Sequence, residues 1–238
     1  MESQEKNCCS DCNLCFVQTD SIFSILTLAE MDELQADKST VSFNYGELIF
    51  KEKLHPSGIY IILEGSVKIF KNGFEGKEHI VRFSKKGDIL GYRSLLSGGK
   101  YSCSATAISN TRLCYLSGEL IFKLIKNNPE LSLRFMNLLA HDLKIAEQNT
   151  INMVQKPVRE RIAQTLLLLK EFYGFELDNA TINISLKRDE LASIAGTSRE
   201  TAIRLLFEFC DDEIISITGR KIKIYNLDKL IKIANQSF

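Results

Sequence analysis

The feature that most constrains the fold is a pair of short helical segments separated by a tight turn. The first helix is predicted over Arg188–Ile194, Gly196 supplies the turn, and Ser198 can cap a second helix from Arg199 to about Cys210. The segment that follows, IISITGRKIKIYN, is predicted to form a strand, a turn at Thr218–Gly219 and a second strand. Together these segments predict a winged helix-turn-helix.

The second helix of this motif has an apolar face and a polar face. Its apolar residues recur at helical spacing and are predicted to face the core: Ala202, Leu205, Leu206 and Phe209. The opposite face carries Arg199, Glu200, Ile203 and Arg204. Arginine can donate two hydrogen bonds to guanine, glutamate can accept one from cytosine, and an apolar side chain can touch a thymine methyl group. We therefore predict that these four residues contact DNA bases.

The alternative for this face is a solvated helix surface with i,i+4 charge compensation. The predicted wing favours DNA binding, because Thr218, Arg220 and Lys221 could hold phosphates there. Arg188, at the start of the first helix, is a further predicted backbone contact. A ligand-sensing module that does not bind DNA would have no use for the wing or the polar face.

Residues 21–128 have the pattern of a small antiparallel β-domain. A short amphipathic helix comes first, and from about Thr40 the chain alternates in polarity over short segments rich in β-branched and aromatic residues. Glycines punctuate these segments, and Asn72–Lys77 is a glycine-bearing hairpin loop. The pattern predicts a β-roll, a closed arrangement of the jelly-roll type.

A long helix is predicted over 129–156. Pro129 can occupy its first turn and Pro157 ends it. Its apolar residues favour packing on a second copy of the chain, although a helix folded back on its own domain is the alternative. The predicted dimer contacts are Phe135, Leu138, Leu139 and Leu143.

The predicted fold class is therefore α+β. Its parts are a cysteine-rich segment (1–20), the β-roll sensor domain (21–128), the dimerisation helix (129–156) and the winged helix-turn-helix domain (157–238).

The composition limits the classes of protein that remain. Thirty Asp and Glu balance 30 Lys and Arg, so DNA binding must come from a local patch. No apolar run reaches the ~20 residues of a membrane span, and the opening MESQEKNCC matches neither a secretory signal nor a transit peptide. We expect a cytoplasmic protein without membrane contact. The sequence has no GxSxG, HExxH, Walker or GxGxxG motif, so we expect no enzymatic activity.

Over nearly its whole length the chain resembles the CRP/FNR family of transcription regulators. TSRETAIRLL is similar to the family's recognition helix, RIAQTLLLL to the first helix of its DNA domain, and GIYIILEGSVKIF with GKEHIVRFSKKGDILG to its β-roll. The resemblance implies a homodimer that reads palindromic double-stranded DNA, with RNA polymerase as a further partner. It also implies base contacts by Arg199, Glu200 and Arg204, and backbone contacts by Ser198, Thr201 and Thr218.

The resemblance does not extend to the residues that bind cyclic AMP. Family members that bind it carry a glutamate after the GDxxG turn and an Arg-Ser pair about ten residues later. Here those positions are Tyr92, Ser102 and Cys103. Without the arginine there is no bidentate clamp for the cyclic phosphate, so cyclic AMP is disfavoured. Another small molecule in the β-roll, or no effector, stays open.

The cysteines point to a different effector. Iron–sulfur clusters need four thiolates, commonly several from one short loop and one from elsewhere. Cys8 or Cys9, with Cys12 and Cys15, could supply the loop, and Cys114 is the candidate for the fourth ligand. Oxygen-sensing members of the family hold a [4Fe–4S] cluster in a similar way, although the C-x2-C-x2-C spacing here is tighter. We expect a [4Fe–4S] cluster on Cys9, Cys12, Cys15 and Cys114 and a redox or gas signal. Zinc, or no metal, is the alternative.

Overall fold

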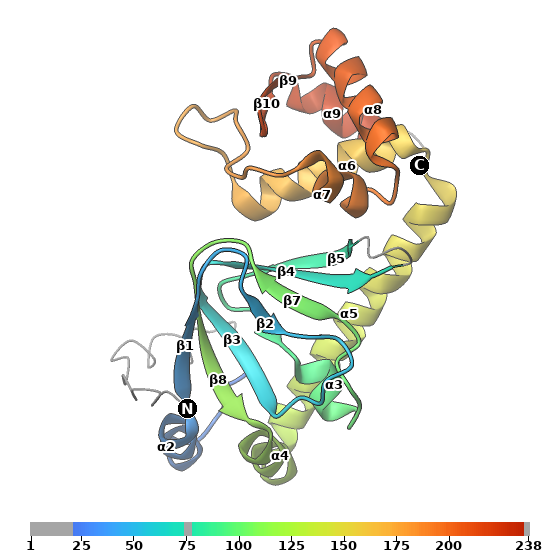
Figure 1. The fold of residues 1–238 in the computed structure, drawn as a ribbon. Helices are drawn as coiled ribbons and strands as arrows, with labels where there is room; N and C mark the ends of the chain where they lie inside the picture. Colours follow the sequence, from blue (N-terminus) through green and yellow to red (C-terminus); the bar gives the residue numbers. More distant parts are fainter. Residues whose placement is uncertain (1–20, 74–77, 236–238) are drawn as a thin grey trace. The chain divides into compact units, whose positions relative to one another are not determined.

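The computed structural model describes residues 21–73 and 78–235, shown as a ribbon in Figure 1. The chain forms two compact units. The first holds the described residues up to Lys71 together with Arg82–Lys144, and the second holds Asn72–Val81 and the described residues from Ile145 onward. One long helix therefore contributes residues to both units, with the division between Lys144 and Ile145.

The first unit is built on two antiparallel four-stranded sheets, although Asn72 and Glu78–Val81, at the ends of two of their strands, group with the second unit. One sheet has the order β1 (Ser39–Phe43), β8 (Thr111–Ser117), β3 (Gly58–Glu64) and β6 (Ile89–Leu90). The other has the order β2 (Leu48–Phe50), β7 (Ser104–Ala107), β4 (Ser66–Asn72) and β5 (Glu78–Lys85). This is the predicted β-roll, and the α+β fold class is confirmed.

Strands β3 and β8 supply the core on both of their faces, because successive side chains in a strand point to opposite sides. Ile62 and Leu113 pack between the two sheets, whereas Ile61 and Cys114 pack in a second cluster with residues of the helices. A sharp turn joins β3 to β4 at Gly65, whose φ is 89°. A Cβ atom there would lie 2.5 Å from the carbonyl oxygen of Asn110, so glycine is required.

The described residues of this unit include the helices α2 (Leu28–Asp37), α3 (Tyr92–Leu96), α4 (Gly118–Asn127) and the first part of α5 (Pro129–Gln155). Pro129 occupies the first turn of α5, as predicted, and the Asn128 side chain accepts a hydrogen bond from the Leu131 N–H at 3.1 Å. Leu131 and Phe135 then bury their side chains in the cluster that contains Cys114. The start of α5 is thereby fixed to the β-roll.

The second unit contains the predicted winged helix-turn-helix. Its elements are α6 (Val158–Tyr173), α7 (Arg188–Ile194), α8 (Arg199–Asp211), β9 (Ile215–Thr218), β10 (Lys221–Ile224) and α9 (Leu227–Ala234). Helix α6 packs on α9, and α7 packs on α8. The end of α5 is also tied to this unit, because buried Lys156 donates from Nζ to the carbonyl oxygen of Ala234 at 2.9 Å.

Candidate nucleic-acid interface

Helix α8 begins at the predicted cap. The Ser198 hydroxyl accepts a hydrogen bond from the Thr201 N–H at 3.1 Å and donates to the Thr201 hydroxyl at 3.0 Å. The cap satisfies one of the N–H groups that a helix start leaves without an intrahelical partner. It fixes the first turn of α8, where the predicted base contacts lie.

The two faces of α8 divide as the sequence predicts. The core-facing side chains are at most 4% exposed: Ala202, Leu205, Leu206 and Phe209. On the other face, Arg199, Glu200 and Arg204 are exposed and Ile203 is half-buried. Four side chains with the chemistry of base readout therefore lie on the outer surface of one helix.

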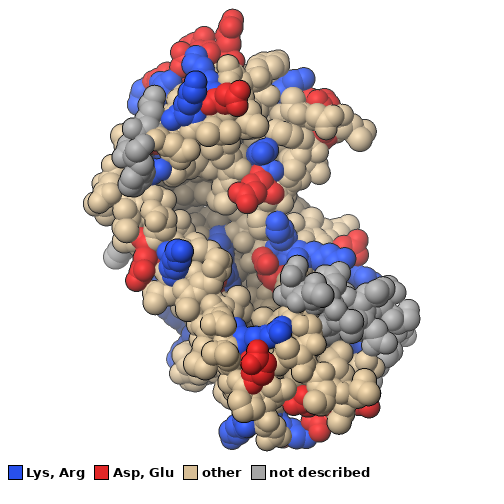
Figure 2. Space-filling model, turned by 180° about the vertical axis from the view of Figure 1, so that it is seen from behind, with Lys and Arg blue, Asp and Glu red and all other residues tan. Residues whose placement is uncertain are grey.

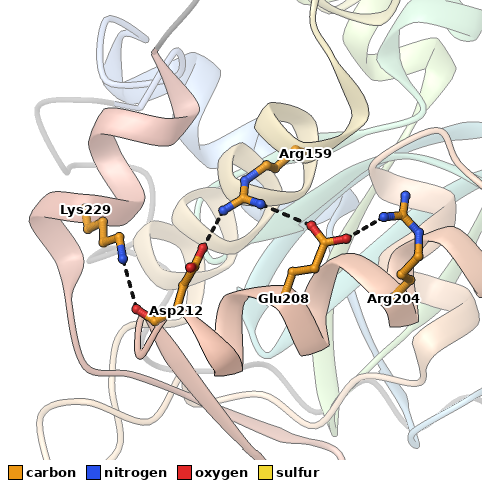
Figure 3. Close-up of polar contacts among 5 residues, drawn as sticks. All are labelled: Arg159, Arg204, Glu208, Asp212 and Lys229. Atoms are coloured by element: carbon orange, nitrogen blue, oxygen red, sulfur yellow. Dashed lines mark hydrogen bonds and ion pairs between the residues drawn. The ribbon is translucent and has the colours of Figure 1, made fainter.

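The guanidinium of Arg204 is held by a network of charged side chains, drawn in Figure 3. Its Nη1 donates to Oε1 of Glu208, one helical turn further along α8. The other oxygen of Glu208 accepts from Nη1 of Arg159, on α6, at 3.1 Å. Arg159 also reaches Oδ2 of Asp212 at 2.6 Å, and Lys229 donates to the Asp212 carbonyl at 3.0 Å. The network connects three helices of the second unit.

Arg199 has a looser partner. Its Nε lies 3.6 Å from Oδ1 of Asp189 on α7, and both side chains are more than half exposed. An exposed pair of this kind contributes little to stability, typically about 0.2–1 kcal/mol. Arg199 can therefore leave Asp189 for a base or a phosphate at small cost.

The wing is a tight hairpin. Thr218 pairs with Lys221, so the turn consists of Gly219 and Arg220 rather than of Thr218 and Gly219 as the sequence predicted. Gly219 adopts φ 60°, a conformation that glycine reaches without strain. Thr218 is the last residue of β9, and its side chain is exposed together with that of Arg220.

Two predicted phosphate contacts have protein partners. Arg188 donates from Nη2 to the carbonyl oxygen of Gly219 at 2.9 Å, and its Nη1 is buried without a hydrogen-bond partner among the described residues. Burial lowers the pKa of this guanidinium. Lys221 pairs with Glu176 at 2.8 Å. Arg188 thus links α7 to the turn of the wing, and its phosphate contact stays a prediction.

The apolar residues of α5 lie on two different faces. Phe135 is 2% exposed and Leu138 and Leu139 pack against the same core cluster, so these side chains are used within their own unit. The role of these three residues in a dimer stays a prediction. Among the predicted contacts Leu143 alone is strongly exposed, at 60%, and it lies on a stripe with exposed Ala140 and with Met136, which is 56% exposed.

A small pocket in the first unit is closed by the chain's own side chains. Phe50 stacks on Tyr101 with ring centroids 4.1 Å apart, and the cavity beside them is about 30 Å³. Arg82 Nη1 donates to both oxygens of Asp142 on α5, at 3.0 and 3.2 Å. The Tyr92 hydroxyl donates to the same carboxylate. The basic wall of the pocket is therefore already occupied by a carboxylate of this chain.

The structure describes one of the four predicted cluster ligands. Cys114, on β8, is fully buried and packs in the cluster that also contains Phe23. Cys9, Cys12 and Cys15, as well as Cys8, lie outside the described residues. Among the residues that are described, no three His, Cys, Asp or Glu side chains converge as a metal site. The cluster that contains Cys114 nevertheless includes Phe23, which follows Cys15 by eight residues.

Charges of both signs alternate over the face drawn in Figure 2. This distribution agrees with the zero net charge and places the weight of DNA recognition on individual side chains. No helix in the described part of the chain combines the length and the apolar character that a membrane crossing requires.

Three important residues were not found from the sequence. Glu208 lies four residues after Arg204, a spacing at which helical side chains meet, so that pair could have been found. Arg159 is 49 residues from Glu208, and Asp142 is 60 from Arg82. No local pattern signals contacts of such long range.

A β-roll, a long helix and a winged helix-turn-helix define a class of DNA-binding transcription regulators. Residues 40–128 match the cyclic nucleotide-binding domain family, and residues 160–233 match the Crp-like helix-turn-helix domain family. A relative from Salmonella typhimurium, the cAMP-activated global transcriptional regulator CRP, is 31% identical over 168 residues, which is 70% of this chain and 80% of that protein. The fumarate and nitrate reduction regulatory protein of Vibrio cholerae is 25% identical over 98% of this chain and 94% of its own length.

Solved structures agree with this class. A CRP/FNR-family transcriptional regulator from Thermus thermophilus superimposes with a TM-score of 0.72 at 25% identity, over 84% of this chain and all of the other. A putative regulator from Eubacterium rectale has the same fold, with a TM-score of 0.77 at 17% identity over 90% and 97% of the two chains. The chain belongs to the CRP/FNR family and is a DNA-binding transcription regulator rather than an enzyme.

Proposed function

We propose that the chain acts as a homodimer on palindromic operators and responds to a redox or gas signal sensed at its N-terminal cysteines. The observation that carries DNA recognition is the outer face of α8, where Arg199, Glu200 and Arg204 are exposed. The wing supports this function, since Arg188 holds it against α7 and leaves Arg220 exposed at its tip. Arg220 could then hold a phosphate while α8 lies in the major groove.

Arg204→Ala is expected to cost about 1–3 kcal/mol of specific DNA binding, because it removes a bidentate donor to one guanine. Selection from random DNA should return a palindrome whose half-sites resemble TGTGA rather than TTGAT, since the exposed face resembles that of the cyclic-AMP-type members. The variant should lose its preference at one base pair of each half-site. A non-palindromic selected site, or equal weakening on specific and random DNA, would contradict the assignment.

The homodimer is supported by the exposed stripe of α5. Met136 and Leu143 are seven residues apart and exposed Ala140 lies between them, so the three lie on nearly one line of the helix. Large apolar side chains gathered on one line are a mark of an interaction surface. A second copy of the same helix would cover the stripe, as in a two-fold symmetric interface.

The state of the β-roll pocket supports an effector other than cyclic AMP. The Phe50–Tyr101 stack lies beside a small cavity of about 30 Å³ that is also lined by Arg82 and Tyr92. Asp142 already pairs with Arg82, so an anionic ligand would have to displace a carboxylate of the chain. A different small molecule in the β-roll, or no effector, remains the second candidate because the pocket keeps its basic side chains.

For the signal, we propose a [4Fe–4S] cluster held by Cys12, Cys15, Cys114 and one of Cys8 or Cys9. Cys114 fits this use in two respects. Its thiol is shielded from water, and apolar surroundings of this kind tune a bound cluster. Its neighbour Phe23 follows Cys15 by eight residues, a length that spans at most about 28 Å. The loop cysteines are thus within reach of Cys114.

Protein made without oxygen is expected to contain four iron and four sulfide per chain if the cluster proposal is correct. Cys114→Ala should abolish the iron and the charge-transfer absorbance, because one of the four thiolates is lost. Cys103→Ser and Cys210→Ser are the matched controls and should keep both signals. The proposal fails if the anaerobic protein contains no stoichiometric iron, or if Cys114→Ala retains it with the fold intact by circular dichroism.

A further inference from the structure

The network of Arg159, Glu208 and Arg204 surrounds a residue that we assign to base contact. The Glu208 carboxylate uses one oxygen for each arginine, so it joins α6 to the exposed end of Arg204 (Figure 3). The Glu208 side chain is 35% exposed and that of Arg204 is 65% exposed. Glu208 therefore lies behind Arg204 rather than at the outer surface.

Arg159 is itself well anchored. Its guanidinium carbon lies 5.1 Å from the centroid of the buried Phe209 ring, a cation–π contact, and its Nη2 binds Asp212 at 2.6 Å. Because Arg159 has two further contacts, it fixes the position of the Glu208 carboxylate. A fixed carboxylate can hold the end of a long side chain that would otherwise sample many rotamers.

Arg204 keeps donors for DNA while it binds Glu208. Glu208 contacts Nη1 alone, and an arginine has five N–H donors in a planar fork. The edge formed by Nη2 and Nε remains available for two parallel hydrogen bonds to guanine O6 and N7. The contact with Glu208 can thus persist in the DNA complex.

We propose that Glu208, held by Arg159, is a specificity-determining positioning residue. It fixes the Arg204 guanidinium in the orientation that reads a guanine, and it repels the phosphates that a mobile Arg204 could otherwise bind. This inference rests on the proposed function, because it assumes that Arg204 contacts a base. The ordering of Arg204 then precedes binding, so its entropic cost does not reduce specific affinity.

Glu208→Gln is the informative variant. An amide has a single acceptor oxygen, so it cannot hold both arginines as the carboxylate does. The ratio of specific to random DNA affinity is expected to fall about tenfold, with the loss concentrated at the base pair that Arg204 reads. Affinity for random DNA should stay equal or rise, and its log–log salt slope should steepen by about one, because Arg204 becomes free to bind a phosphate.

A second variant tests whether Arg159 holds Glu208 in place. Arg159→Met keeps the packing on Phe209 but releases Glu208, and it should relax the same base preference. The double variant should be no less specific than Glu208→Gln alone, because both changes break the same connection from Arg159 through Glu208 to Arg204. Asp211→Asn is the matched control: it removes an exposed carboxylate of the same helix that lies outside the network, and it should leave base preference unchanged.

Arg204→Ala, measured in parallel, tests the base contact of Arg204 separately from the positioning role of Glu208. If it leaves the preferred sequence unchanged, the assignment of Arg204 to a base fails. If Arg204→Ala relaxes the preference while Glu208→Gln does not, or if Glu208→Gln weakens specific and random DNA equally, the positioning role of Glu208 is overturned and the base contact stands. Circular dichroism of each variant checks that the helix-turn-helix remains folded.

Discussion

Leu143→Asp is expected to convert the dimer to monomer at micromolar concentration. The Leu143 side chain is 60% exposed in the single chain, and burying a leucine in an interface contributes about 1.5–3 kcal/mol. A two-fold interface loses this contribution twice, and a charge placed against an apolar partner adds a desolvation cost. The dissociation constant should therefore rise roughly 100-fold or more. Sedimentation equilibrium measures it directly.

Leu28→Asp is the matched control for this variant. Leu28 is 87% exposed at the first residue of α2, where an acidic side chain is favourable for the helix. The control should sediment like the unmodified chain. In operator binding, Leu143→Asp should weaken association with the full palindrome far more than with an isolated half-site. If Leu143→Asp and the unmodified chain have the same mass in solution, with and without operator, the stripe on α5 is not the dimer surface.

Asp142→Ala is expected to destabilise the β-roll unit by about 2–4 kcal/mol. The Asp142 side chain is 11% exposed, binds Arg82 through both oxygens and accepts the Tyr92 hydroxyl. Its removal leaves a partly buried guanidinium and a buried hydroxyl without their acceptor, which costs more than the pair contributed. Hydrogen exchange of the amides in β3 and β8 measures the free energy of opening the β-roll unit. It does so independently of the opening of the winged helix-turn-helix unit.

Two milder variants calibrate the effect. Tyr92→Phe removes only the hydroxyl and should cost about 1 kcal/mol. Asp142→Asn keeps one acceptor oxygen and should fall between the two. The Tyr92 hydroxyl also has a pKa raised by burial and by Asp142, so alkaline conditions above its ordinary range should not ionise it before the unit opens. An Asp142→Ala protein with unchanged exchange rates would show that this carboxylate is not a structural link.

The winged helix-turn-helix could be predicted closely because its signals are local. Ser198, Gly196 and the apolar spacing of α8 each determine geometry within a few residues. The orientation of α5 could not be predicted in the same way. Its sequence has two apolar stripes, and only the folded β-roll shows that Phe135 faces inward while Leu143 does not. Periodicity shows that a helix has an apolar face, but it does not show which part of the protein covers that face.

The same limit applies to the partner of Arg188 within the protein. A basic residue at the start of a helix-turn-helix is chemically suited to a phosphate, and nothing in its sequence neighbourhood points to a carbonyl oxygen 31 residues away. Its actual partner exists only once the wing has folded against α7. The exposed arginines of α8 could be predicted because exposure follows from helical spacing, whereas their carboxylate partners Asp189 and Arg159-bound Glu208 come in part from tertiary packing.

The contact between Lys156 and Ala234 has a consequence for the order in which the protein folds during synthesis. The β-roll strands and the first part of α5 are complete once about 144 residues have been made, so that unit can fold while translation continues. The other unit must wait, because α6 packs on α9 and Lys156 takes its acceptor from the last residue of α9. A nascent chain arrested before Leu227 should therefore carry a folded β-roll and a DNA-binding unit that is not yet formed. A ribosome paused at that point would hold a regulator unable to reach its operator.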